Sequence, residues 1–475
     1  MQADDKSPAG GSATAGPQGN GHGVVILVTA AAALGGFLFG FDTAVINGAV
    51  DAIQAEFHMS SGLLGFVVSA ALLGCAVGAW FAGPIANRTG RLRVMLIAAV
   101  LFAASAIGSA LAVGPIDLTI WRILGGLAVG AASVIAPAYI AEISPAHLRG
   151  RLGSLQQLAI VTGIFVALLV NYVLAAAAGG ASESVPWGGT AWRWMFAVEL
   201  LPALLYGVLA LRIPESPRYL VQKQRVTEAR EVLRRFVGGD VDQRIREITR
   251  SLGEGTQAIR LADLRGPRLG LLPIVWVGLL LSVFQQFVGI NVIFYYSTTL
   301  WRSVGFTEEN ALLITVITSV TNILTTIVAI ALVDRIGRKP LLVAGATGML
   351  VTLVTLAWCF STATGSGDDV TLGPVIGKVA LVAANLYVVS FGVSWGPVVW
   401  VLLGEMFNNR IRATALAVAA AAQWVANWLV STSFPVLADV GLAFAYGLYA
   451  GCAALALVFV LRMVRETKGR ELEDM

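Results

Sequence analysis

Long stretches without charge are the feature that most restricts how this chain can fold. Twelve apolar segments follow one another, and each is close to the roughly 20 helical residues that cross the apolar core of a bilayer. A helix satisfies its backbone hydrogen bonds within one segment, as lipid requires. We therefore predict an all-α polytopic membrane protein with twelve transmembrane helices. The expected segments cover about 24–46, 62–86, 94–114, 118–141, 152–177, 192–212, 270–300, 310–333, 340–361, 375–404, 412–434 and 440–462.

Composition excludes a soluble domain. The chain is 57% hydrophobic and 13% charged, whereas soluble domains have about 25% charged residues. Basic and aromatic residues are not interleaved, so we expect no nucleic-acid partner. The cysteines lie in apolar segments without CxxC spacing and the histidines are scattered, so we expect no disulfide framework, metal or cofactor. These residues are Cys75, Cys359, Cys452, His22, His58 and His147.

Charge in the short loops predicts the orientation of the chain. Loops after the second, fourth, eighth and tenth segments carry ten basic residues, and the opposite loops carry three. Basic loops stay in the cytoplasm, so both termini are expected there, in the inner (plasma) membrane. The first apolar segment is too long for a signal peptide and lacks a cleavage pattern, so we expect it to remain as the first helix. The ten are Arg88, Arg91, Arg93, Arg149, Arg151, Arg335, Arg338, Lys339, Arg410 and Arg412.

The chain repeats itself, which predicts two six-helix halves in parallel repeat. The motif NRTGR at 87–91 recurs as DRIGR at 334–338, and the pair Glu142 and Arg149 recurs as Glu405 and Arg412, 263 residues later. PESPR closes the first half and RETKG the second. The expected organisation is a disordered cytoplasmic tail (1–22), an N-terminal bundle (23–213), a cytoplasmic helical linker (214–268), a C-terminal bundle (269–464) and a cytoplasmic tail (465–475).

The linker contains two stretches with helical spacing. VTEAREVLRRFV places Val226, Ala229, Leu233 and Val237 on one face, and QRIREITRSL follows. Short amphipathic helices that cap the cytoplasmic side are one interpretation. A charged linker without a gating role is the alternative.

Repeated charges at the cytoplasmic helix ends suggest a gate. Carboxylates and guanidinium groups can form a lattice that holds the two halves together on the inside and breaks when the protein opens inward. The alternative is that the arginines only set topology, although topology does not require Glu142 and Glu405. The candidate gate residues are Arg88, Arg91, Glu142, Arg149, Glu215, Arg218, Asp334, Arg335, Arg338, Glu405, Arg412 and Glu466.

Three charged residues lie well inside the apolar segments: Asp42, Arg122 and Glu199. Their depths, counted along the helices, place all three in the outer half of the membrane, where they could meet. Ionisable groups in lipid are costly and usually functional. One arginine cannot neutralise two carboxylates, so an acid that pairs with Arg122 in one state and binds a proton in another is a workable proton carrier. A static buried salt bridge is the alternative.

The seventh segment carries uncharged polar groups in its middle, within Phe284–Tyr296, which reads FQQFVGINVIFYY. Amides and phenols offer donors and acceptors without charge, as a neutral polyhydroxylated ligand requires. Aromatic faces beside them would stack on a sugar ring. The alternative is that these amides only bond neighbouring helices.

These motifs resemble the sugar porter family of the major facilitator superfamily, from Gly35 to Leu472. The resemblance is carried by QQ-x-x-GIN-x-x-x-YY, GGFLFGFDTAVING, NRTGR, RILGG, PAYIAEISPAHLRGRLGSLQQ, PESPRYL, DRIGRKP, SWGPVVWVLLGEMF and ETKGRELE. It implies the major facilitator fold. The sugar-facing positions it implies are Phe39, Gln157, Ile164, Gln285, Gln286, Asn291, Tyr295, Gly396, Trp400, Gln423, Trp424 and Asn427.

The resemblance also predicts what is transported. Proton-coupled bacterial members carry Asp at the position of Asp42, where animal facilitators carry Asn. Ile164 is apolar where some pentose carriers place an amide, which favours a glucose-like hexose. We therefore predict a proton-coupled monosaccharide symporter that works by alternating access in the bilayer, as a monomer. The alternatives are an uncoupled facilitator of the same fold or a non-transporting sugar receptor; no motif of an enzyme appears.

Overall fold

The computed structural model describes residues 19–143, 149–237, 240–253, 264–266, 270–364, 371–407 and 411–467. Within these residues, twelve helical spans are long and apolar enough to cross a membrane. The described chain is helical apart from turns and two isolated β-bridges. The predicted all-α polytopic fold is therefore confirmed.

The first six spans form one half of the molecule, which we call the N-half. Its first helix begins at Gly19, inside the range expected for the tail; residues 1–18 lie outside the described part. The elements of the N-half are α1 (Gly19–Val45), η1 (Ile46–Gly48), α2 (Val50–Glu56), α3 (Ser61–Thr89), α4 (Arg91–Ala110), α5 (Pro115–Ile143), α6 (Arg149–Ala178), α7 (Ala191–Ala197) and α8 (Leu200–Ala210).

The last six spans form the C-half. Its elements are α12 (Pro273–Phe287), α13 (Ile290–Arg302), α14 (Glu308–Ile336), α15 (Arg338–Ser361), α16 (Pro374–Ser390), η5 (Phe391–Trp395), α17 (Gly396–Met406), α18 (Arg412–Val440) and α19 (Leu442–Met463). Four short elements connect the halves: α9 (Pro217–Gln222), α10 (Val226–Val232), η2 (Leu233–Val237) and α11 (Val241–Gly253).

Three of the spans that we expected as continuous helices are interrupted. The sixth changes from α7 to α8 at Glu199, and the tenth contains the π-helical turn η5. The seventh breaks between α12 and α13, where Gly289 has a left-handed φ of 85°. Interrupted helices at membrane depth leave backbone groups that other side chains must satisfy. Each interruption lies beside a residue that the sequence analysis assigned to a site.

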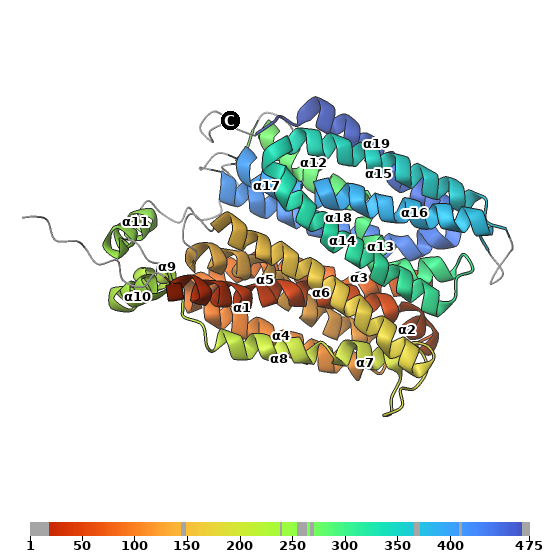
Figure 1. Cartoon of the computed structure of the whole chain (residues 1–475), viewed down its shortest axis with the longest axis horizontal. Helices are drawn as coiled ribbons and strands as arrows, with labels where there is room; N and C mark the ends of the chain where they lie inside the picture. Colours follow the sequence, from red (N-terminus) through yellow and green to blue (C-terminus); the bar gives the residue numbers. More distant parts are fainter. Residues whose placement is uncertain are drawn as a thin grey trace, which may run out of the picture.

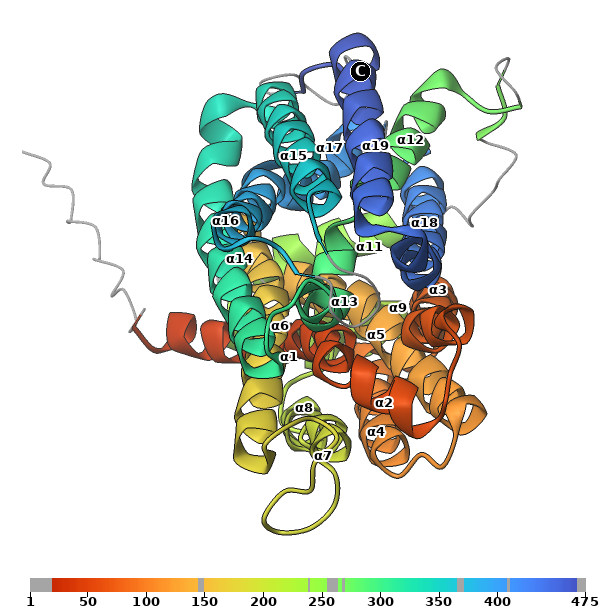
Figure 2. The ribbon, with the colours of Figure 1, turned by 90° about the vertical axis from the view of Figure 1, so that its right-hand side faces the viewer.

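The two halves lie side by side with their long helices running in a common direction (Figure 1). Helices α9, α10 and α11 lie beyond one end, which we call the linker end; α2 and α7 lie toward the opposite end, which we call the far end. Viewed from the far end, α3 packs against α18 and α6 packs against α14 along the boundary between the halves (Figure 2).

The linker helices pack on one another through a small apolar cluster. Ala229 of α10 contacts Leu220 and Val221 of α9, while Val226 is 36% exposed. Leu233 is also buried, and η2 packs against α1. The expected apolar face therefore forms at Ala229 and Leu233, and the side chain of Val237 lies outside the described part.

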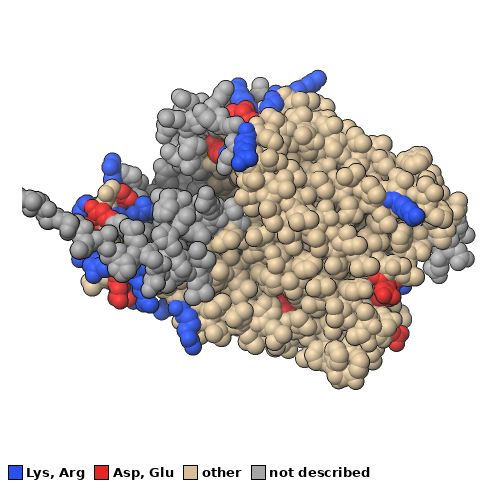
Figure 3. Space-filling view, viewed as in Figure 1, with Lys and Arg blue, Asp and Glu red and all other residues tan. Residues whose placement is uncertain are grey.

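Charge is concentrated at the two ends of the molecule. In the view of Figure 3, the described Lys, Arg, Asp and Glu side chains gather at the linker end, a few lie near the far end, and the wide surface between them is nearly free of charge. A wide uncharged surface between two charged ends is the kind of surface that contacts lipid tails.

Candidate functional site

The three charges inside the apolar spans meet in the N-half. Asp42 on α1 is 0% exposed, and Arg122 on α5 and Glu199 at the α7–α8 junction are each 1% exposed. Arg122 donates from Nη1 to both Asp42 Oδ1 and the Asp42 carbonyl oxygen, at 3.0 Å each. Glu199 is close enough to interact electrostatically with both. The Arg122 guanidinium also lies 5.8 Å from the centre of the Phe196 ring.

This cluster is incompletely paired. Asp42 Oδ2, Glu199 Oε1 and Arg122 Nε are buried without a hydrogen-bond partner among the described residues. Gly125 of α5 makes room for the carboxylate, because a Cβ there would lie 2.9 Å from Asp42 Oδ1. Two carboxyl groups share one cation in a site of low dielectric, so the cluster can bind a proton without acquiring an excess of positive charge.

The amides of the seventh span surround its break. Gln285 donates from Nε2 to the carbonyl oxygens of Trp395 (2.9 Å) and Gly396 (3.2 Å), at the end of η5. Its Oε1 is buried without a partner among the described residues. Across the break, Asn291 donates from Nδ2 to Gln286 Oε1 at 2.5 Å. The cluster therefore offers one unused acceptor and one amide pair that a hydroxyl group could open.

Other residues assigned to the sugar site lie beside one another in pairs. Tyr295 on α13 lies close enough to Asn427 on α18 for their side chains to interact. Phe39 of the N-half lies 5.8 Å, ring centre to ring centre, from Trp424 of the C-half. The neighbouring Gln423 has a buried Oε1 without a described partner. These contacts bring residues from α1, α13 and α18 together.

No described hydrogen bond or ring contact joins Gln157, Ile164 or Trp400 to another assigned residue. Gln157 and Ile164 are half-buried on α6, and Trp400 on α17 is 44% exposed. Next to Gln157, Gln156 is buried and both of its amide atoms lack described partners. The sequence analysis missed Gln156, although a pair of adjacent amides in an apolar segment was a signal for it.

Asn47 of η1, which was not among the predicted site residues, forms hydrogen bonds with α13. Asn47 is buried; its Nδ2 donates to the Phe294 carbonyl oxygen at 2.9 Å, and its Oδ1 accepts from Thr298 Oγ1 at 2.6 Å and Thr298 N at 3.4 Å. These contacts join the N-half to the C-half near the far end. An amide five residues after Asp42 in an apolar segment was the available signal.

The described polar contacts between the halves gather toward the far end. Besides those of Asn47, Asp51 accepts from Thr299 Oγ1 at 2.7 Å and Arg302 Nη1 at 2.6 Å. Ser69 and Thr432 share a hydrogen bond of 2.5 Å, and Glu308 accepts from the backbone N–H of Ala181 at 2.7 Å. The largest apolar core likewise contains far-end residues of both halves, whereas a second core, from Val28 to Ile213, lies in the N-half.

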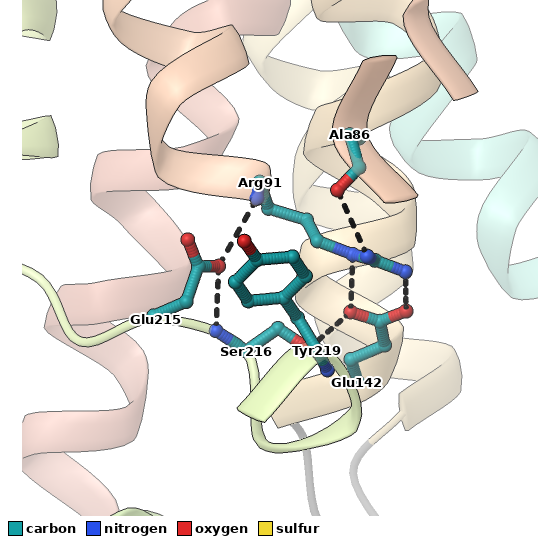
Figure 4. A network of polar contacts seen from close by, with 6 residues as sticks. All are labelled: Ala86, Arg91, Glu142, Glu215, Ser216 and Tyr219. Atoms are coloured by element: carbon teal, nitrogen blue, oxygen red, sulfur yellow. Dashed lines mark hydrogen bonds and ion pairs between the residues drawn. The ribbon is translucent and has the colours of Figure 1, made fainter. Parts of the chain in front are cut away.

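At the linker end, the ion pairs Arg91–Glu142 and Arg338–Glu405 each lie inside one half. Arg91 makes two hydrogen bonds to Glu142, of 3.0 and 2.8 Å, and Ser216 Oγ also bonds Glu142 (Figure 4). Glu215 accepts from the backbone N–H of Arg91 at 3.1 Å, at the start of α4. A carboxylate at a helix N-terminus satisfies unpaired N–H groups and complements the helix dipole.

The C-half repeats this arrangement group by group. Arg338 makes two hydrogen bonds to Glu405, of 3.0 and 2.7 Å. Glu466 accepts from the backbone N–H groups of Arg338 at 3.0 Å and Lys339 at 2.9 Å, and Thr467 Oγ1 donates to Glu405 at 2.6 Å. Among the described residues, Glu142 thus pairs with Arg91 and Glu405 with Arg338, each inside its own half.

The remaining candidate gate residues differ in exposure. Arg88 and Arg335 are exposed, and Arg218 is half-buried. The side chains of Arg149, Asp334 and Arg412 lie outside the described part.

The fold, the buried charges and the uncharged amides define a multi-pass membrane transporter. The chain belongs to the sugar (and other) transporter family, whose sequence model matches residues 28–475. It is 62% identical over 454 residues to the glucose transport protein of Synechocystis sp., covering 95% of this chain and 97% of that one. It is 40% identical over 488 residues to the D-xylose-proton symporter of Escherichia coli, covering 95% of each.

Solved structures agree with this family assignment. The inward-open xylose transporter XylE of E. coli matches with a TM-score of 0.79 and 39% identity, over 94% of this chain and 98% of that one. XylE bound to 6-bromo-6-deoxy-D-glucose matches with a TM-score of 0.77, over 95% and 98%. The predicted family and its major facilitator fold are confirmed.

Proposed function

We propose that this protein is a proton-coupled symporter of a glucose-like monosaccharide that works by alternating access. The observation that carries the proposal is the incompletely paired cluster of Asp42, Arg122 and Glu199, buried within the bundle of a sugar transporter family member. A facilitator needs no titratable group at this depth, where charge is costly. The name of the Synechocystis relative, glucose transport protein, supports the choice of sugar.

We assign sugar binding to the uncharged groups around the break of the seventh span. Gln285 is held by two backbone carbonyl groups through its Nε2, which leaves its Oε1 to accept from a sugar hydroxyl. Gln286 and Asn291 would exchange their mutual hydrogen bond for bonds to the ligand. The other assigned positions are Phe39, Gln157, Ile164, Tyr295, Gly396, Trp400, Gln423, Trp424 and Asn427.

We assign proton binding to Asp42, with Glu199 as the second acid and Arg122 as the shared cation. With its carboxylate charged, Asp42 pairs with Arg122, as in this structure. Protonation of Asp42 removes the charge that holds this pair and leaves Glu199 as the counter-ion. A proton can thus change the contacts of α1 with α5, and α1 continues through η1 into the far-end contacts of Asn47.

We propose that the structure represents a state that opens toward the linker end, and that this end faces the cytoplasm. The far-end position of the described contacts between the halves supports the first part. The basic residues of the linker-end loops support the second, because such loops remain in the cytoplasm. The plasma membrane is the expected location, with both termini inside and a functional monomer.

We further propose that the linker-end charges close the cytoplasmic side in the opposite state. In that state Glu142 and Glu405 would add contacts across the halves to those they make within them. The side chains of Arg149 and Arg412, which lie on the first turns of α6 and α18, are the expected partners.

Uptake into proteoliposomes tests the proposal. Radiolabelled D-glucose should accumulate above equilibrium when an inward-directed proton gradient is imposed, and should only equilibrate without one. Equilibration that the gradient does not change would identify an uncoupled facilitator. Binding without uptake would identify a sugar receptor. D-Xylose measured in parallel decides between a hexose and a pentose as the preferred substrate.

A further inference from the structure

The break in the seventh span depends on glycine. Gly289 has a φ of 85°, in the left-handed region that other residues rarely adopt. A Cβ at this position would also lie 2.8 and 2.9 Å from two ring carbons of Tyr449, on α19. The angle between α12 and α13 is therefore set partly by a ring from the last span.

The break leaves one carbonyl group without its helical partner. In a continuous helix, the Val288 oxygen would accept from the N–H of Val292, but that N–H bonds the Gly289 oxygen at 3.2 Å instead. The phenol of Tyr387, on α16, donates to the Val288 oxygen at 2.7 Å. Tyr387 is 0% exposed, so without its hydroxyl the carbonyl would be an unpaired acceptor at membrane depth.

A second hydrogen bond also spans the break. Asn291 Nδ2 donates to Gln286 Oε1, and both residues belong to the sugar site under the proposed function. A sugar hydroxyl would compete for this bond and weaken it. The bond from Tyr387 joins no assigned sugar-binding group, so a bound sugar leaves it in place.

We propose that Tyr387 is a positioning residue of the sugar site. Through the Val288 carbonyl group it fixes the direction in which α13 leaves α12, so that Gln285 and Gln286 on one helix face the same ligand as Asn291 and Tyr295 on the other. When sugar opens the Gln286–Asn291 bond, Tyr387 keeps α13 aligned. This inference rests on the proposed sugar site for its consequence, but its geometric part does not depend on any ligand.

Tyr387→Phe tests the proposal, because it removes only the hydroxyl group. Affinity for D-glucose, measured by calorimetry, should fall on the order of tenfold, since a site that is less preorganised binds less tightly. The matched control is Tyr139→Phe, which also removes a buried phenol-to-carbonyl bond, of 2.6 Å to Pro214, but in the N-half. The control should leave the affinity unchanged.

A second readout requires no sugar. Spin labels at Ser303, just beyond α13, and at Val440, at the end of α18, both lie in the C-half and report the direction of α13. In a cysteine-free background, their distance distribution should broaden in Tyr387→Phe and remain narrow in Tyr139→Phe. Gly289→Ala disturbs the same break by placing a Cβ against the Tyr449 ring, and it should broaden the distance distribution further.

The outcomes distinguish the positioning role of Tyr387 from the proposed sugar function. If Tyr387→Phe and Tyr139→Phe lower thermal stability equally, and neither changes the label distances or the glucose affinity, Tyr387 is only a packing residue and the inference is overturned. If the wild type binds no monosaccharide while the label distances respond as expected, the positioning role stands and the proposed sugar function fails.

Discussion

Asp42 has one carboxylate oxygen bonded to Arg122 and the other without a described partner. Asp42→Asn imitates the protonated acid permanently. The two halves can still exchange bound sugar across the membrane, so exchange of labelled for unlabelled glucose is expected to persist in proteoliposomes. Accumulation driven by a proton gradient is expected to disappear, because the gradient has no group through which to act.

Substitution of Arg122 can be compared with Asp42→Asn. Arg122→Ala leaves Asp42 and Glu199 in low dielectric without a counter-charge, so it is expected to impair folding or exchange more than Asp42→Asn does. Proton-driven accumulation by Asp42→Asn vesicles would transfer the coupling role to Glu199 and leave Asp42 as a packing residue.

Gln285 is the residue on which the sugar site can be tested most directly. Gln285→Ala removes the unpaired Oε1 and frees the carbonyl groups of Trp395 and Gly396. Glucose binding should weaken by about 1–3 kcal/mol, the cost of leaving a buried polar partner unpaired. Calorimetry on the folded variant measures this. An affinity equal to that of the wild type would remove Gln285 from the site.

At the scale of the helices, hydropathy predicts where the spans lie but not where they break. Gly289 permits a left-handed φ, yet glycine also occurs inside regular helices. The break is fixed by Tyr387 and Tyr449, which come from α16 and α19, far along the chain. The same limit applies to Glu199: its burial follows from the apolar segment around it, but its place at a helix junction depends on how α7 and α8 pack against α1 and α4.

The linker-end motifs show a similar division. The repetition of NRTGR and DRIGR at corresponding positions of the two halves predicts which charged residues form the linker-end clusters. It does not predict partners: Glu142 pairs with Arg91, which is 51 residues away. Sequence spacing alone cannot distinguish a contact within a half from one between halves, since both bring arginines to the same membrane face.

Glu405→Gln tests the proposed gate. If Glu405 gains a contact across the halves when the linker end closes, its neutralisation disfavours that state, because only state-dependent contacts move such an equilibrium. Spin labels on the linker ends of α5 and α17 should then shift toward longer distances. The control is Thr467→Val, which removes a bond to Glu405 inside the C-half. Equal distributions in wild type and Glu405→Gln would limit Glu405 to its pairing with Arg338.

At the scale of the whole molecule, the described polar contacts that join the halves lie near the far end. Asp51 and Arg302 form an ion pair between the halves there, with side chains 26% and 43% exposed. Glu56 and Arg193 form a pair of the same length, 2.6 Å, with side chains 36% and 26% exposed, but inside the N-half. Only the first pair depends on closure of the far end, and the second is its matched control.

Asp51→Asn is therefore expected to raise the population that opens at the far end, and Glu56→Gln is not. The pair is partly exposed, so its contribution is about 0.2–1 kcal/mol, a shift of a few-fold at most. Distances between labels at Val113 and Val440, which lie at the far ends of the two halves, would measure it. Identical distributions for the two variants would mean that the other far-end contacts, including those of Asn47, and the apolar core keep the far end closed without this pair.

The exposure of the Asp51–Arg302 pair has a consequence for the medium in which the protein works. Dissolved ions screen charges over about 8 Å at 0.15 M, and they reach this pair more readily than the Arg91–Glu142 pair, whose side chains are 8% and 15% exposed. If the far end faces outward, rising external salinity should loosen the outer closure while the Arg91–Glu142 pair holds. The resting orientation of the transporter would then follow the ionic strength outside the cell.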